Sequence, residues 1–251
     1  MRAFLSLFVF VFIVKILVGQ PEDIRVLIIG EGEAWSDPEA MKIRQYHNKG
    51  INFSWIQGGE TAWKELDPAR YDIIWVHRGD SLSDADFEDD PGYYAAMLDY
   101  VVHGGSILLT QHALDFIHRS GLEPVAPQHR SKSSEDNGYG RMLGFHSFLH
   151  HPLFDSLNGG AYIWKPPFDT TVTQCGYFGD KVPLNGRVIA VDWDYIFLRE
   201  NSKLIIEYES GKGRVLGIGA YFNPGAPNLN RQHYDLFYKN VFEYLSGKKQ
   251  G

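Results

Sequence analysis

Short apolar runs alternate with longer amphipathic segments between residues 25 and 121. The apolar runs are RVLIIG, INFSWIQ, YDIIWVH and SILLT, a form that is typical of strands covered on both faces. The segments DPEAMKIRQYHNKG, ETAWKEL, PGYYAAMLDYVVHGG and HALDFIHRSG are predicted to be helices. Strands that alternate with helices predict a doubly wound, mostly parallel α/β sheet, flavodoxin-like, with helices on both faces.

The second half of the chain has a different pattern. Residues 122 to 140 lack periodicity, and we expect a surface loop there. Residues 187 to 220 read as several strands with the turn SGKG between the last two, which predicts a C-terminal β-hairpin region. HYDLFYKNVFEYLSG closes the chain as an amphipathic helix. Without repeats or linkers, residues 21–251 are predicted to form a single domain.

The N-terminal segment is predicted to be a signal peptide spanning residues 1–20. Arg2 precedes an apolar run from residue 4 to 14, and Gly19 and Gln20 supply a plausible cleavage site. A membrane anchor is the alternative, but Lys15 interrupts the run, and a spanning helix needs about 20 apolar residues. We therefore expect a bacterial protein exported to the periplasm or the medium, without stable membrane insertion after cleavage.

Charge and cysteine content narrow the range of partners. Removing Arg2 and Lys15 with the leader lowers Lys+Arg from 24 to 22 against 31 acidic residues, so the formal charge goes from −7 to −9. An acidic protein without a basic run is a poor partner for nucleic acid. Cys175 is the only cysteine, so it forms no internal disulfide and no thiolate cluster. The 6 Trp, 14 Tyr and 16 Phe are compatible with stacking on a small-molecule carbohydrate.

Four segments together resemble a known family. They are YDIIWVH, LDYVVHGGSILLTQHA, HHPLFDSL, and YESGKGRVLGIGAY followed by FYKNVFEYL. In this order they resemble the trehalose-utilisation (ThuA-like) family of the class I glutamine amidotransferase-like superfamily. The resemblance spans most of residues 25 to 246 and implies sugar metabolism, with chemistry on oxidised (keto) sugars.

The elbow after the fourth strand departs from the amidotransferases of that superfamily. Those enzymes carry a cysteine at this turn, whereas this chain has Thr110-Gln111-His112-Ala113. Attack on a glutamine amide needs a thiolate at the elbow with a base beside it, so the chain is predicted not to be a glutamine amidotransferase. ThuA-like proteins carry a histidine near this position, which His112 matches.

Ligands of doubly wound sheets bind at the carboxyl ends of the strands, and this rule selects the candidate site. His112 is the predicted general acid/base, because imidazole titrates near neutral pH. The predicted catalytic residues are His112, Asp80 and Glu31, and the predicted substrate-binding residues are Arg78, His77, Gln111, His146, Tyr221 and Asn223. Polar residues follow strands in any case, so Arg78 in an internal ion pair and His112 at a helix start are the alternatives.

No metal and no cofactor are predicted. His146, His150 and His151 invite a metal interpretation, but no nearby acid completes the set and Pro152 ends any helix there. The chain also lacks a phosphate loop, a dinucleotide fingerprint and a Gly-x-Ser-x-Gly elbow.

The sequence thus predicts an exported carbohydrate-processing protein that carries out acid/base chemistry on a sugar or keto-sugar. Hydrolysis, elimination and isomerisation remain open, and so does whether the chain is an enzyme; if it is one, we expect a carbohydrate-active hydrolase or isomerase. A non-catalytic sugar-binding module on the same fold is the second hypothesis, and a structural protein of the cell surface is the third.

Overall fold

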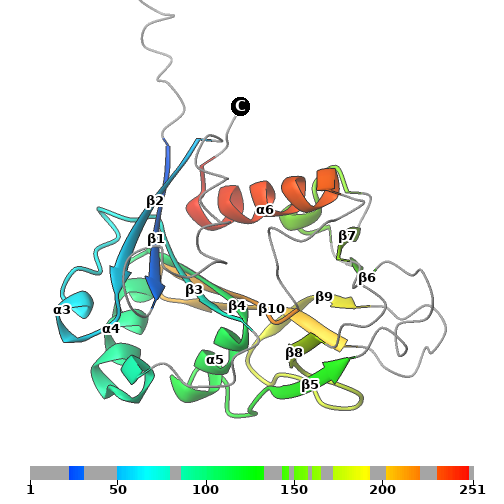
Figure 1. Ribbon diagram of the computed structural model, residues 1–251, viewed down its shortest axis with the longest axis horizontal. Coiled ribbons are helices and arrows are strands. Elements are labelled where there is room, and N and C mark those ends of the chain that lie inside the picture. Colours follow the sequence, from blue (N-terminus) through cyan, green and yellow to red (C-terminus); the bar gives the residue numbers. More distant parts are fainter. Residues whose placement is uncertain are drawn as a thin grey trace, which may run out of the picture.

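The computed structural model describes residues 23–30, 50–79, 86–132, 143–146, 150–157, 160–164, 172–192, 202–220 and 231–248. Five parallel strands form the centre of the molecule, in the order β2-β1-β3-β4-β11 (Figure 1). They are β1 (Ile24–Gly30), β2 (Ile51–Gln57), β3 (Ile73–Arg78), β4 (Ser106–Gln111) and β11 (Gly213–Ile218). The predicted parallel α/β sheet is therefore confirmed.

An antiparallel extension continues the same sheet beyond β11. It consists of β10 (Ser202–Ser210), β9 (Arg187–Asp192), β6 (Leu143–His146) and β7 (Gly160–Trp164), which complete a nine-stranded sheet. The turn SGKG joins β10 to β11, where Ser210 pairs with Gly213, so the predicted C-terminal hairpin is confirmed.

Helices cover both faces of the sheet, as the pattern predicted (Figure 1). One face packs on α6 (Arg231–Ser246), and the other on α4 (Pro91–Val102) with the short helices α3 (Glu60–Trp63) and α5 (Phe116–Arg119). Successive side chains of a strand point to opposite faces. Val26 accordingly belongs to the core cluster of Phe242, and Leu27 to the cluster of Met97. Full burial of one such side chain contributes about 2 kcal/mol.

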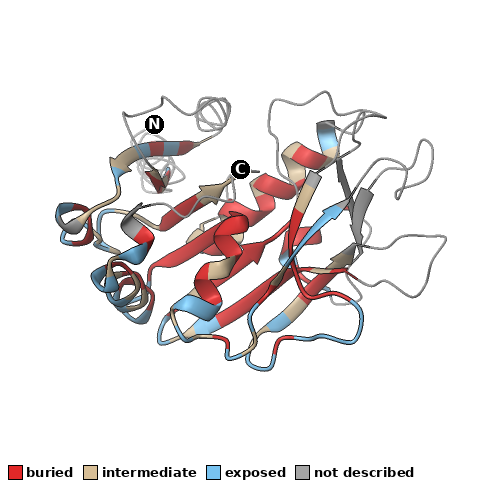
Figure 2. Ribbon diagram, turned by 60° about the horizontal axis from the view of Figure 1, so that its bottom comes forward, coloured by how far each residue is buried: buried red, intermediate tan, exposed pale blue. Residues whose placement is uncertain are grey.

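Local signals explain where α4 begins and ends. Asp90 caps the helix by accepting a hydrogen bond of 2.8 Å from the backbone N–H of Gly92, and Pro91 occupies the first turn, where its missing N–H costs nothing. The chain leaves the helix at Gly104, whose φ of 112° is readily adopted only by glycine. β4 follows directly, and Figure 2 shows the central strands as almost wholly buried.

A second, two-stranded sheet lies beside the main one. It pairs β5 (Gln128–Lys132) antiparallel with β8 (Val172–Gly176). The expectation of a surface loop over residues 122 to 140 is therefore wrong for residues 128 to 132. The strand was not predicted because its sequence, QHRSK, is polar and charged and has no apolar alternation. It is stabilised instead by pairing with β8.

Glu123 anchors the segment that leads into β5. Burial alone would raise the pKa of its carboxyl, but hydrogen bonds from the backbone N–H groups of Leu184, Asn185, Val125 and Gly186 outweigh that effect and lower the pKa. One carboxylate therefore ties the chain before β5 to the loop before β9.

The described residues also include the single-turn 3-10 helices η2 (Asp86–Asp89), η3 (His112–Asp115) and η4 (Pro152–Phe154). The predicted signal segment and the helix predicted after β1 lie outside the described residues. Among the helices that the structure describes, none is both long and apolar enough to cross a bilayer.

Candidate functional site at the carboxyl end of strand β4

The turn from β4 into η3 has a strained backbone at Gln111. Its φ of 56° and ψ of −121° lie in a region that residues with a side chain rarely adopt, at a cost of about 1–3 kcal/mol. Parallel pairing of β4 with β3 and β11 holds this conformation, since Arg78 is the register partner of Gln111 and Ile218 that of Thr110. The elbow expected at this point of the sequence is therefore present, and Gln111 is the residue at its apex.

A continuous chain of hydrogen bonds begins beside this elbow. Nε2 of His112 lies 2.5 Å from Oγ1 of Thr173, and its Nδ1 lies 2.8 Å from Nδ1 of His129. Nε2 of His129 in turn lies 2.7 and 2.9 Å from the two carboxylate oxygens of Asp115. Four side chains from η3, β5 and β8 therefore form one path: Thr173, His112, His129 and Asp115.

The acceptors in this path determine where its protons lie. An ionised Asp115 only accepts, so Nε2 of His129 carries the hydrogen that it donates. When His129 is neutral, its Nδ1 accepts from Nδ1–H of His112, and Nε2 of His112 is left to accept from the hydroxyl of Thr173. The arrangement therefore leaves a base, Nε2 of His112, in contact with a hydroxyl.

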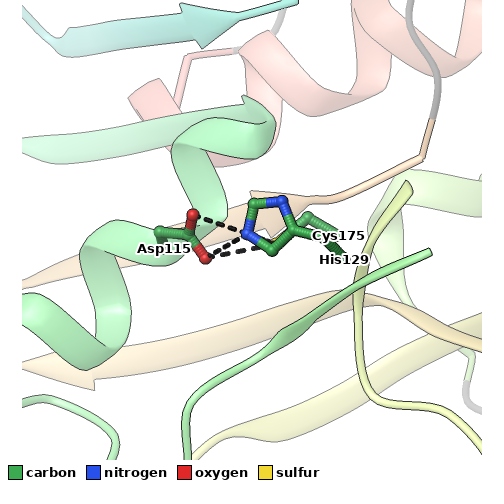
Figure 3. A group of neighbouring side chains, drawn as sticks. All are labelled: Asp115, His129 and Cys175. Atoms are coloured by element: carbon green, nitrogen blue, oxygen red, sulfur yellow. Dashed lines mark hydrogen bonds and ion pairs between the residues drawn. The ribbon is translucent and has the colours of Figure 1, made fainter. Parts of the chain in front are cut away.

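Cys175 lies next to this path on β8 (Figure 3). Its thiol donates to Oδ1 of Asp115 at 3.6 Å, and Sγ lies 3.9 Å from Nε2 of His129. Burial of the thiol and the neighbouring Asp115 carboxylate raise the pKa of Cys175 well above its usual range. In this environment Cys175 is a thiol rather than a thiolate, so it does not serve as the cysteine nucleophile of an amidotransferase.

Close backbone contact fixes Cys175 against the end of β11. Its N–H donates to the carbonyl oxygen of Gly219 at 2.8 Å. A Cβ atom on Gly219 would lie 1.6 Å from the carbonyl oxygen of Cys175, so only glycine fits there. Close backbone packing therefore holds the small sheet against the main sheet at the site.

The site faces solvent through only some of its side chains. His112 and Cys175 are fully buried, whereas the side chains of His129 and Asp115 are 36% and 23% exposed. Thr173 is half-buried. In the described structure His112 is thus shielded from solvent, whereas its partners Thr173 and His129 are partly exposed.

His77 and Arg78 lie at the end of the neighbouring strand β3, but their side chains separate. Nδ1 of His77 lies 2.7 Å from Oγ1 of Thr110, which also accepts from Nε1 of Trp75, a member of the core on the α6 face. Arg78 points to the opposite face and donates to Glu88 of η2 at 2.9 Å. Its positive charge acts on Cys175, lowering the pKa of the thiol in part. Arg78 therefore lies beside the site, whereas the described contact of His77 is with Thr110.

The described structure does not test whether the remaining predicted residues belong to this cluster. Glu31, Asp80, Tyr221 and Asn223 lie outside the described residues. His146 ends β6, where it pairs with Gly160 of β7 and Val191 of β9. The roles given to all of these residues, and to His112 itself, stay predictions.

Four members of the site were missed by reasoning from the sequence: Asp115, His129, Thr173 and Cys175. Asp115 had a usable signal, since it follows His112 by three residues in HALD and shares its side of a 3-10 turn. His129 and Thr173 had none, because β5 and β8 come together only through the pairing of residues 40 to 48 positions apart.

Comparison with known proteins extends this picture at the level of fold. No protein-family model and no curated protein matches the chain. Among solved structures, a putative ThuA-like protein from Parabacteroides merdae ATCC 43184 is similar, with 13% identity, a TM-score of 0.57 and 92% of both chains covered. A cytoplasmic protein from Salmonella typhimurium LT2 shows 14% identity and a TM-score of 0.51, covering 88% of this chain and 99% of that one.

A third similar structure belongs to a larger enzyme. It is a catalytic mutant of a GH42 β-galactosidase from G. stearothermophilus, with 15% identity and a TM-score of 0.51. The match covers 93% of this chain but only 31% of the β-galactosidase chain. These identities show the fold alone, and the resemblance seen in the sequence is confirmed at that level: the chain shares the α/β fold of the ThuA-like protein.

Proposed function

We propose that this protein is an exported carbohydrate-processing enzyme that carries out acid/base chemistry on a sugar or keto-sugar. The observation that carries the proposal is the path from Thr173 through His112 and His129 to Asp115. A hydroxyl, two imidazoles and a carboxylate in sequence can accept a proton at one end and spread the resulting positive charge toward the other.

These hydrogen bonds would let His112 act as a base, with the proton arriving from the side of Thr173 and the charge shared toward Asp115. A proton taken up at Nε2 of His112 makes that ring an imidazolium, and the neighbouring His129 shares the charge with the carboxylate of Asp115. A carboxylate beyond an imidazole stabilises the protonated ring and holds its orientation. The half-buried Thr173 hydroxyl is the group that passes the proton from a bound hydroxyl or an acidic C–H to His112.

The substrate class comes from the family resemblance in the sequence, which implies sugars and keto-sugars. Aromatic richness is consistent with that class. A β-galactosidase is among the structurally similar proteins, but that likeness extends to the fold and adds no substrate.

The proposal is tested by incubating the purified full chain with a panel of neutral sugars and their keto derivatives in deuterated water. Proton NMR then follows both substrate loss and deuterium uptake at carbons next to a carbonyl. We expect turnover or exchange with at least one sugar, and a loss of about 100-fold or more in the His112→Gln variant, in line with removal of a general base.

His103→Gln is the matched control, because His103 is an exposed histidine at the end of α4, away from the path. Its turnover should equal that of the unmodified chain. Calorimetric binding of a sugar without any turnover would instead identify the chain as a sugar-binding module. Full turnover in His112→Gln would remove His112 from the mechanism.

Export is tested separately. Expression in a bacterium, followed by fractionation and mass determination of the chain, should give a periplasmic or secreted form that begins at Pro21. A chain that stays with the membrane and keeps residues 1–20 would show an anchor instead.

A further inference from the structure

We propose that Asp115, His129 and Cys175 form a binding site for one Zn²⁺ ion, with a fourth coordination position open to solvent. The three side chains come from η3, β5 and β8 and converge on one point (Figure 3). Their potential ligand atoms all lie within 4.8 Å of one another.

The distances between these atoms match a tetrahedral zinc site closely. Zinc bonds of ~2.0 Å to oxygen, ~2.1 Å to nitrogen and ~2.3 Å to sulfur place sulfur ~3.6 Å from the other two ligands and nitrogen ~3.3 Å from oxygen. Sγ of Cys175 lies 3.6 Å from Oδ1 of Asp115 and 3.9 Å from Nε2 of His129. Oδ1 and Nε2 are 2.9 Å apart, so this pair must open by only about 0.4 Å to admit the ion.

The ligand types select the metal. A set of one sulfur, one imidazole nitrogen and one carboxylate oxygen suits Zn²⁺, whereas Mg²⁺ and Ca²⁺ prefer oxygen ligands alone. Three protein ligands with a fourth position open is the arrangement of catalytic rather than structural zinc. Exposure agrees with this, because His129 and Asp115 reach solvent while Cys175 closes the buried side.

His112 is a positioning residue for this site. Zinc-bound histidines almost always donate their second ring N–H to a neighbour, which fixes the ring. With Nε2 of His129 on the metal, its Nδ1–H donates to Nδ1 of the buried His112, and Nε2–H of His112 donates to Thr173. The hydrogen bonds from His129 through His112 to Thr173 therefore fix the orientation of His129 as a metal ligand.

When the metal is bound, Nε2 of His112 carries a hydrogen, so a metal-bound water would replace His112 as the base of the proposed function. Held by Asp115, His129 and Cys175, the ion would lower the pKa of a bound water, whose proton would pass to solvent, and it would polarise a carbonyl oxygen of the sugar. This catalytic role rests on the proposed function, whereas metal binding by the three residues does not.

Binding is measured on the full chain after removal of bound metal with a chelator. Competition with a chromogenic chelator should give one Zn²⁺ per chain, and Co²⁺ should give a thiolate-to-cobalt charge-transfer band in the near ultraviolet. Because Cys175 is the only cysteine, that band reports this site and no other. We expect Cys175→Ser to abolish the band and to weaken Zn²⁺ binding at least about 100-fold.

Further variants separate loss of a ligand from loss of the fold. Asp115→Asn changes a partly exposed side chain without changing its size, and it should also weaken binding at least about 100-fold in a protein with an unchanged circular dichroism spectrum. His112→Gln should weaken it about 10- to 100-fold through His129. His103→Gln should have no effect. Equal Zn²⁺ affinity of Cys175→Ser and the unmodified chain, or no thiolate band with Co²⁺, would overturn the site.

The two proposals fail in different ways. Stoichiometric Zn²⁺ binding without turnover of any sugar would leave the metal site standing and remove the enzymatic proposal. Turnover that persists at full rate in the chelated protein, together with the absence of Zn²⁺ binding, would retain the acid/base enzyme and remove the metal.

Discussion

Arg78 donates a hydrogen bond of 2.9 Å to Oε2 of Glu88, and both side chains are almost fully buried, with 9% and 6% exposed. Arg119 donates to the same oxygen at 2.9 Å from the solvent side. Together they link the end of β3 to η2 and α5 beneath the candidate site. A buried carboxylate that has lost a cationic partner is strongly destabilising, because it keeps its desolvation cost without the compensating charge.

The variant Arg78→Met should therefore lower the free energy of unfolding by about 3 kcal/mol, measured by urea denaturation. Arg70→Met is the matched control, since Arg70 pairs with Glu65 at the surface, where solvent screens the ion pair. Adding Glu88→Gln to Arg78→Met should recover part of the loss. If Arg78→Met is as harmless as Arg70→Met, the pair is not structural, and the substrate-binding role predicted for Arg78 gains weight.

The hydroxyl of Thr173 should matter to stability as well as to the proposed chemistry. Thr173→Val keeps the shape of the side chain but leaves Nε2 of the buried His112 without its bond to Oγ1. The expected loss is about 1–3 kcal/mol in the free energy of unfolding. Thr173→Ser keeps the hydroxyl and should show a clearly smaller loss in the same denaturation experiment. Similar losses in both variants would mean that the methyl group contributes as much as the hydrogen bond, and a negligible loss in Thr173→Val would show that the hydrogen bond contributes nothing to stability.

The fold was predictable because its signals are local. The apolar runs at β1, β3 and β4 are strands that both faces bury, and the Asp90 cap and the glycines after α4 define its ends. The β5 strand was not predictable, since QHRSK has neither apolar alternation nor a turn that fixes its register, and its paired residues lie 40 to 48 positions away.

The candidate site was only partly predictable for the same reason. His112 follows a strand at the edge where ligands bind, so its position in the sequence pointed to it. Its partners His129 and Thr173 reach it from the small sheet, whose existence could not be predicted from local pattern. Sequence reasoning paired His112 with Asp80 or Glu31, while the carboxylate that the described structure connects to it is Asp115, on the same helical turn.

Acid should destabilise the protein in part through Glu207. Burial alone would raise the pKa of this carboxyl, but hydrogen bonds from Tyr244 and Arg187, together with the His151 ring 3.8 Å away, outweigh burial and lower the pKa to about 2. A carboxyl whose pKa is lower in the folded chain than its ordinary value of 4.5 stabilises the fold above that ordinary value, and this contribution is lost as pH falls toward 2. The contribution is at most about 3 kcal/mol.

The measurement is the free energy of unfolding as a function of pH for the unmodified chain and for Glu207→Gln. The gap between the two should shrink steadily from about pH 5 to about pH 2. Glu209→Gln serves as the control, because Glu209 lies on the same strand but is exposed, and its curve should run parallel to that of the unmodified chain. A gap that stays constant with pH would show that Glu207 acts through packing alone.

The strained backbone at Gln111 leads to a prediction in which two substitutions must be compared. Both Gln111→Ala and Gln111→Gly remove the buried amide side chain, so both lose its contacts equally. Only glycine also relieves the positive φ of 56°, since it has no Cβ to collide with the neighbouring backbone. Gln111→Gly should therefore be more stable than Gln111→Ala by about 1–2 kcal/mol in thermal or urea unfolding. At an ordinary strand position the order would be reversed, because glycine loses more backbone entropy on folding than alanine.

If alanine were the more stable of the two, the elbow would have relaxed to an ordinary backbone conformation once the amide side chain is removed. The side chain of Gln111 would then be what holds the turn at which the candidate site begins.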